Sequence, residues 1–156
     1  MAYNYGAGNL PRLKEILQKL GILSFLLGLI AALGCYFARH VLIGMFLKDS
    51  AAAAMGESLV VFLVIASPVV GLFYLGTNFL QASGNAVVAT AVSVLRQGAL
   101  LIPCLYLMKY LLGFVGIAAA HTIADGISAF VAITACLWQY RVLKKQFPEN
   151  NQNAKE

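Results

Sequence analysis

Four long runs of apolar residues, separated by short polar stretches, dominate the pattern of hydrophobic and polar positions. They cover residues 21–38, 58–80, 86–108 and 111–138. A helix needs about 20 apolar residues to cross the roughly 30 Å core of a bilayer. Core helices of a soluble protein are the alternative, but four such runs with so few charges favour membrane spans. The pattern therefore predicts an all-α integral membrane protein with four transmembrane helices within residues 21–145.

The polar stretches predict the remaining elements. Residues 1–20 suggest a cytoplasmic loop and an amphipathic helix lying at the membrane interface, with leucines on one face at Leu10, Leu13, Leu17 and Leu20. Asn9 can cap this helix and Pro11 suits its first turn. The connection between runs one and two is too long for a tight turn, and Asp49 or Ser50 can cap a helix that continues into run two. "QASGNA" (81–86) predicts a short turn, and residues 146–156 predict a disordered tail.

Composition and charge support a membrane protein. Of the 156 residues, 61% are hydrophobic and 11% charged, against about 25% charged in soluble domains. The net charge of +5 does not predict a nucleic-acid partner, because the basic residues flank the apolar runs and no basic–aromatic patch is visible. The bilayer is the expected partner. Cys35, Cys104 and Cys136 fit no metal-site spacing and are expected to be free thiols.

The basic residues also predict the orientation. The ends of the chain carry Arg12, Lys14, Lys19, Arg141, Lys144, Lys145 and Lys155, whereas the opposite connections carry Arg39, Lys48 and Lys109. Because positive charge gathers on the cytoplasmic side, we expect a multi-pass protein of the cell (inner) membrane with both termini in the cytoplasm.

Two charged residues lie deep within the runs, Arg96 in the third and Asp125 in the fourth. A charge at this depth costs about 2.5–3.5 kcal/mol on the insertion scale, so it faces other helices, water or a partner. Counted from the same side, Arg96 is roughly 15 Å and Asp125 roughly 22 Å deep, a difference that an extended arginine can cover. We expect them to pair between adjacent helices, either as a lock on helix register or as part of a proton or transport path.

His121 lies one helical turn from Asp125 on the same face. The two form a candidate proton relay, although a hydrogen bond from His121 to its own helix is an equally good interpretation. Small residues recur every four positions nearby, at Gly116, Ala120, Ala124 and Ser128. Such a stripe lets another helix approach closely, so we expect the fourth span to lie inside a bundle with little of it facing lipid.

Further candidates are helix-bending and polar residues. Pro68 and Pro103 each remove a backbone hydrogen bond, either as static kinks or as bends around a substrate site. Thr77, Asn78 and Gln81 end the second run and either line a water-filled vestibule or cap the helix. No nucleophile–base set, metal-ligand cluster or glycine-rich phosphate loop is visible, so we expect neither an enzyme nor a bound metal or cofactor.

Four segments indicate a protein family more specifically than the composition does. They are YNYGAGNLPRLKEIL (3–17), LIGMFLKDSAAAAMGESLVVF (42–62), NFLQASGNAVVATAVSVLRQGALLIP (78–103) and GIAAAHTIADGIS (116–128). In this order and spacing they resemble the multidrug and toxic compound extrusion (MATE) family of transporters. The resemblance implies two six-helix lobes, of which this chain matches the last four helices of the second. It therefore implies a fragment whose missing partners are the N-terminal lobe and the remaining helices.

The resemblance also implies a function: a cation-coupled antiporter for multidrug efflux that exports small cationic or amphipathic xenobiotics by alternating access in exchange for protons or sodium. The family's patterned positions match at Gln81, Arg96, Gln97, Gly98 and Asp125. The second run lacks the carboxylate with which some branches bind the cation. Thr122 stands where the family often has a proline, which implies a straighter last helix.

Two other functions remain open at this point. A relative that flips a lipid-linked sugar would share the two-lobe arrangement, but its cavity would need more basic groups than Arg96. A small membrane protein without transport activity, assembling with itself or a partner, gains support from the four spans.

Overall fold

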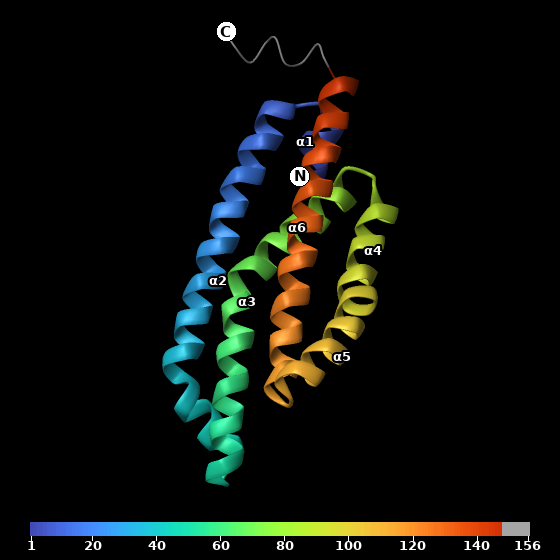
Figure 1. Cartoon of the computed structure of the whole chain (residues 1–156). Coiled ribbons are helices and arrows are strands. Elements are labelled where there is room, and N and C mark those ends of the chain that lie inside the picture. Colours follow the sequence, from blue (N-terminus) through green and yellow to red (C-terminus); the bar gives the residue numbers. More distant parts are fainter. Residues whose placement is uncertain (148–156) are drawn as a thin grey trace.

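The computed structural model describes residues 1–147, and every element in this range is helical. The elements are α1 (Ala2–Gly6), α2 (Leu10–Phe46), α3 (Ser50–Ala82), α4 (Ala86–Val94), η1 (Leu95–Leu100), α5 (Leu101–Leu112) and α6 (Val115–Gln146). η1 is a π-helical segment that joins α4 and α5 into one bent rod. Four long rods thus run up and down beside one another (Figure 1), as the four apolar runs predict.

α2 is one unbroken helix, which differs from the expected separate helix before a span at 21–38. Asn9 caps it as predicted, because its side-chain oxygen accepts a hydrogen bond from the Arg12 amide at 3.2 Å. The first half of the leucine face is covered by other helices, whereas Leu20 is exposed. Leu10 and Leu13 are buried against Phe79 and Leu143, so the start of α2 belongs to the helix bundle.

The connection between α2 and α3 is much shorter than expected. It consists of Leu47, Lys48 and Asp49, because α2 continues past residue 38, while α3 begins at Ser50, where the alanine-rich helix is predicted. Asp49 caps α3 as predicted, accepting from the Ala51 amide at 3.2 Å. The apolar runs thus indicate which part of each helix can lie within the bilayer, whereas the capping residues determine where the helix begins or ends.

Two glycines with positive φ separate the later helices. Gly84, at φ +80°, lies in the predicted turn between α3 and α4. Gly113, at φ +62°, ends α5, so α6 begins at Val115 rather than at residue 111. α6 ends at Gln146, and the rest of the predicted disordered tail lies outside the described residues.

α3 is the central helix and packs against both α2 and α6. Glycines, which have no side chain, allow these helices to approach closely. A Cβ on Gly28 of α2 would lie 2.7 Å from Pro68 Cα of α3, and one on Gly76 would lie 3.0 Å from the Ala132 carbonyl oxygen of α6. All four members of the predicted small-residue stripe on α6 are buried. The opposite face of α6 is exposed in this chain, with Phe130 and Trp138 among its side chains.

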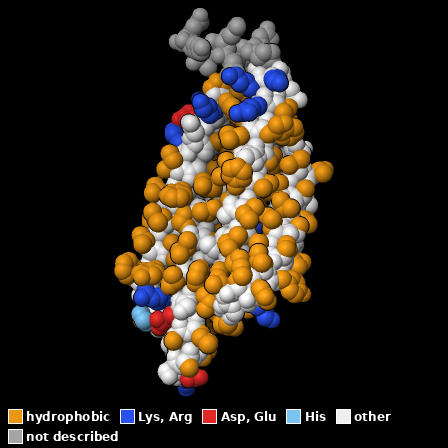
Figure 2. Space-filling view, viewed as in Figure 1, with side chains coloured by type: hydrophobic (Ala, Val, Ile, Leu, Met, Phe, Trp, Pro, Cys, Tyr) orange, Lys and Arg blue, Asp and Glu red, His pale blue; other side chains and the backbone are white. Residues whose placement is uncertain are grey.

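Charged side chains gather at the two ends of the rods, and apolar side chains cover the surface between them (Figure 2). Four helical segments are long and apolar enough to cross a bilayer: Leu10–Phe46, Ser50–Ala82, Ala86–Leu112 and Val115–Gln146. The chain is thus a multi-pass membrane protein. We call the end that carries Arg12, Lys14, Lys19, Arg141, Lys144 and Lys145 the basic end, and the opposite end the distal end.

Candidate functional site

An ion pair between two helices forms the centre of the site. Arg96 lies on η1 and Asp125 on α6, and the Arg96 Nε donates to Asp125 Oδ1 at 2.8 Å. The two side chains are 16% and 15% exposed. The pair predicted from depth alone is therefore confirmed, and each charge has its compensating partner within the apolar part of the bundle.

Two aromatic residues of α3 complete the surroundings of the guanidinium. Its Nη1 donates to the Tyr74 hydroxyl at 3.3 Å. Its central carbon lies 4.7 Å from the Phe73 ring centroid and 5.4 Å from that of Tyr74. These distances suit cation–π attraction, which strengthens away from water. Arg96 thus links α3, η1 and α6 at one point.

The π-helical segment explains how Arg96 reaches this point. Pro103 has no amide hydrogen, so the carbonyl four residues earlier, at Ala99, loses its α-helical partner. A wider π turn is one way for a helix to absorb such a defect, and such turns are frequent at functional sites. η1 ends just before Pro103, and α5 runs at an angle to α4 (Figure 1). The predicted bend is therefore present.

A pocket of about 360 Å³ opens beside the ion pair. Its lining consists of Arg96, Gln97, Leu101, His121, Ala124 and Asp125. Four of the predicted site residues thus meet there: Arg96, Gln97, His121 and Asp125. Because Arg96 already pairs with the Asp125 carboxylate, a cation that binds Asp125 must compete with Arg96.

His121 lines this pocket, and its described hydrogen bond is to its own helix. Nδ1 lies 3.2 Å from the Ile117 carbonyl oxygen, and because a carbonyl only accepts, Nδ1 must donate. The sequence allows either a proton relay with Asp125 or a hydrogen bond from His121 to its own helix, and this contact is the second of the two.

The polar residues at the end of α3 lie elsewhere. Asn78 and Gln81 are exposed on α3 and do not line the pocket. They follow Tyr74 by four and seven residues, so the three share one helical face. Thr77 is buried and donates to the Phe73 and Tyr74 carbonyls, which excludes it from a water-filled vestibule here. Tyr74 and Phe73, which contact Arg96, carry no signal in the sequence that distinguishes them from other aromatic residues of the apolar runs.

Two hydrogen bonds between distant residues were not anticipated. Thr122 Oγ1 on α6 donates to the Phe62 carbonyl of α3 at 2.6 Å, one turn from Asp125. Asn85 Nδ2, in the turn after α3, donates to Gln139 Oε1 at 3.1 Å. Both fix α6 relative to α3 and its following turn, and so hold Asp125 in place.

Comparisons with known proteins agree with this arrangement. The MatE family model matches residues 1–107. The chain is 28% identical to the multidrug export protein MepA of Staphylococcus aureus over 133 residues, which is 85% of this chain and 29% of MepA. It is 29% identical to MepA of Staphylococcus saprophyticus over the same fractions. The chain spans less than a third of the length of these curated relatives.

The fold has a counterpart among solved structures. The MATE transporter VcmN of Vibrio cholerae, in its bent form, superimposes with a TM-score of 0.85 over 92% of this chain and 33% of VcmN, at 21% identity. At this identity the likeness concerns the fold. The four rods are thus packed as they are in part of that transporter.

Proposed function

Because the chain belongs to the MatE family, we propose that it forms the last four helices of a transporter that exports cationic or amphipathic compounds in exchange for protons or sodium ions. The relatives named above are multidrug export proteins, which supports export rather than the flipping of lipid-linked sugars. The observation that carries the proposal is the Arg96–Asp125 pair beside a pocket between helices.

The pair offers a mechanism for coupling. Asp125 carries one negative charge, and three cations can compete for it: Arg96, a proton and a cationic substrate. When a proton or a substrate neutralises Asp125, Arg96 loses its 2.8 Å partner and keeps its contacts to Phe73 and Tyr74. Because Arg96 lies on η1, its release changes how the third rod is held against α6. Alternating access then follows from this exchange of partners.

The proposed orientation places the basic end in the cytoplasm of a cell (inner) membrane. Six of the described basic residues form this end, and Arg39, Lys48 and Lys109 lie near the opposite ends of their helices or in the connection after α2. The excess of positive charge on one side supports this orientation. The N-terminal lobe of the transporter is the proposed partner of the exposed apolar faces.

The test is drug efflux from cells that carry the reading frame of this chain together with its in-frame flanking sequence. Asp125→Asn and Arg96→Ala are expected to abolish efflux of ethidium, a cationic amphipathic dye, while membrane insertion stays normal. Asp49→Asn is the matched control, because it also removes a carboxylate but asparagine caps a helix equally well. Unchanged efflux in both variants, or failed insertion of both, would overturn the proposed role of the pair.

The coupling ion needs a separate measurement. Efflux by the unmodified protein is followed while a proton or a sodium gradient is collapsed in turn. Loss of efflux with one gradient identifies the ion. Efflux that survives the loss of both gradients would contradict cation coupling.

A further inference from the structure

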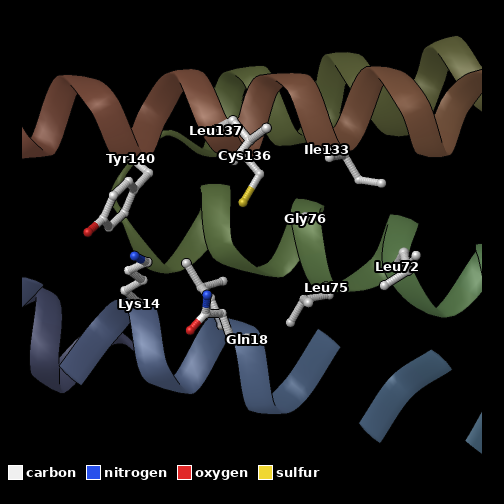
Figure 3. Close-up of a pocket in the computed structure, with 10 residues that line it drawn as sticks. Lys14, Gln18, Leu72, Leu75, Gly76, Ile133, Cys136, Leu137 and Tyr140 are labelled. Atoms are coloured by element: carbon white, nitrogen blue, oxygen red, sulfur yellow. The ribbon is translucent and has the colours of Figure 1, made fainter. Parts of the chain in front are cut away.

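A second pocket lies between α2, α3 and α6 near the basic end, away from the ion pair (Figure 3). Its volume is about 350 Å³, and it shares no lining residue with the pocket beside Asp125. Lys14 and Gln18 extend into it from α2, and Cys136 and Tyr140 from α6 (Figure 3). Gly76 of α3 lies at its floor. The proposed transport function uses none of these residues.

The packing of the helices creates this pocket. α2 and α6 both pack on α3, and the cluster of Leu10, Leu13, Phe79 and Leu143 holds the three helices together at the basic end. Beyond this cluster α3 forms the floor between the other two helices. Gly76 lets α3 and α6 approach closely beside the pocket, since a Cβ at this position would lie 3.0 Å from the Ala132 carbonyl oxygen.

The pocket combines apolar walls with one uncompensated positive charge. Leu72, Leu75, Ile133 and Leu137 supply much of the wall. Within residues 1–147, no carboxylate lies within ion-pair distance of Lys14. The neighbouring Glu15 pairs instead with Lys19, with Oε1 2.6 Å from Nζ. Tyr140 and Gln18 add a hydroxyl and an amide to the lining of the same pocket.

We propose that this pocket binds an anionic membrane phospholipid. One acyl chain lies along the leucine-lined floor, and the phosphate sits at Lys14, with hydrogen bonds from Gln18 and Tyr140. The lining extends over α6 from Ile133 to Tyr140, about 10 Å at 1.5 Å per residue, which accommodates part of a chain. Basic pockets between membrane helices commonly bind anionic headgroups. A cationic drug is disfavoured here because the rim repels it.

The test measures lipid retained by the purified chain in native mass spectrometry. The chain is equilibrated with equal amounts of phosphatidylglycerol and phosphatidylcholine that carry the same acyl chains. We expect preferential retention of phosphatidylglycerol. Lys14→Gln should lower it about five-fold, the effect of one surface lysine on anionic lipid. Lys144→Gln is the matched control: it removes a positive charge from the same end but no side chain of the pocket, so it should change retention of the bound lipid less than about two-fold.

A second pair of variants tests the apolar part. Cys136→Phe fills the pocket and should reduce retention of phosphatidylglycerol, whereas Cys35→Phe, on an exposed part of α2, should not. Helicity by circular dichroism verifies folding, and Lys14→Gln carries the test if Cys136→Phe does not fold. Equal losses with Lys14→Gln and Lys144→Gln would overturn the site, as would displacement of the lipid by ethidium or by a second copy of the chain.

Discussion

α2 and α6 are both long apolar helices, yet the structure uses them differently. α6 buries Gly116, Ala118, Ala119, Ala120, Ala124, Ser128, Ala129, Ala132, Gln139 and Leu143. α2 buries only Leu10, Leu13 and Ala32 of the described chain, and its large apolar side chains between Ile22 and Leu33 are all exposed. The apolar part of α6 has a lower mean hydropathy than that of α2, 1.5 against 2.2, but hydropathy does not say which helix is packed, because lipid is as apolar as leucine. Side-chain size distinguishes the two helices, since close packing in a membrane needs small residues.

The packed helix also carries the polar groups. Asp125, Thr122 and Gln139 of α6 each bond to a residue of another element. The charges of α2 lie toward its ends, where Lys19 pairs with Glu15 and His40 Nδ1 lies 2.7 Å from Glu57 Oε1. An enclosed polar group needs a fixed partner, and only a packed helix provides one.

The largest expected effect comes from removing one charge of the enclosed pair. Asp125→Ala leaves Arg96 without its anionic partner and should lower the free energy of unfolding by about 3–5 kcal/mol. The measurement is unfolding of the purified chain in mixed micelles by SDS titration. Glu15→Ala, which breaks the exposed Lys19 pair on α2, is the control and should have little effect.

The swapped double variant, Arg96→Asp with Asp125→Arg, sharpens this test. If the pair itself provides the stability, the double variant recovers part of what each single swap loses. A double variant no more stable than either single swap would show that surroundings such as Phe73 and Tyr74, rather than the pair, determine the loss.

A smaller effect is expected from enlarging a buried alanine. Ala120 is fully buried on α6, so Ala120→Leu should cost about 1–3 kcal/mol by overpacking. Ala31→Leu, on the exposed face of α2, should be close to neutral under the same SDS titration. Equal losses at both positions would contradict the proposed distinction between a packed and an exposed helix.

The sequence predicted the number and order of the long helices because each contains a run that a bilayer requires. The helices extend beyond these runs, since α2 continues to Phe46, and α6 begins at Val115 rather than at residue 111 because Gly113 ends the preceding helix. The sequence predicts that the face of Leu10, Leu13, Leu17 and Leu20 lies at the membrane interface. An apolar stripe does not reveal whether lipid or protein covers it, and here the partners are Phe79 and Leu143, far away in the chain.

The sequence predicted the part of the candidate site that consists of charged residues, because a charge deep in an apolar helix needs an oppositely charged partner. Arg96 and Asp125 are deep charges of opposite sign on adjacent helices, so each is the natural partner of the other. Tyr74 and Phe73 were not predicted, because an aromatic residue within an apolar run gives no sign of which neighbour it faces. Their role depends on how α3 is rotated against η1, and that rotation depends on the packing of the whole bundle.

A modest effect should follow from the loss of one hydrogen bond between helices. Thr122→Val removes the hydroxyl that donates to Phe62 and should cost about 0.6 kcal/mol, and at most about 1.7. Thr134→Val is the matched control, since Thr134 is exposed and donates to Val131 of its own helix. If Thr134→Val lowers the free energy of unfolding as much as Thr122→Val does, the threonine hydroxyl stabilises the protein through its bond within α6 and not through its bond to α3.

The smallest expected effect is that of His121→Gln. Glutamine keeps a donor, and the described bond of His121 is to Ile117 of the same helix. The free energy of unfolding should therefore change by less than about 0.5 kcal/mol. Because His121 also lines the pocket beside Asp125, efflux is measured across pH in the same variant. A helix-bonded histidine leaves that pH profile unchanged, whereas a shifted profile with unchanged stability would assign His121 to a proton path with Asp125.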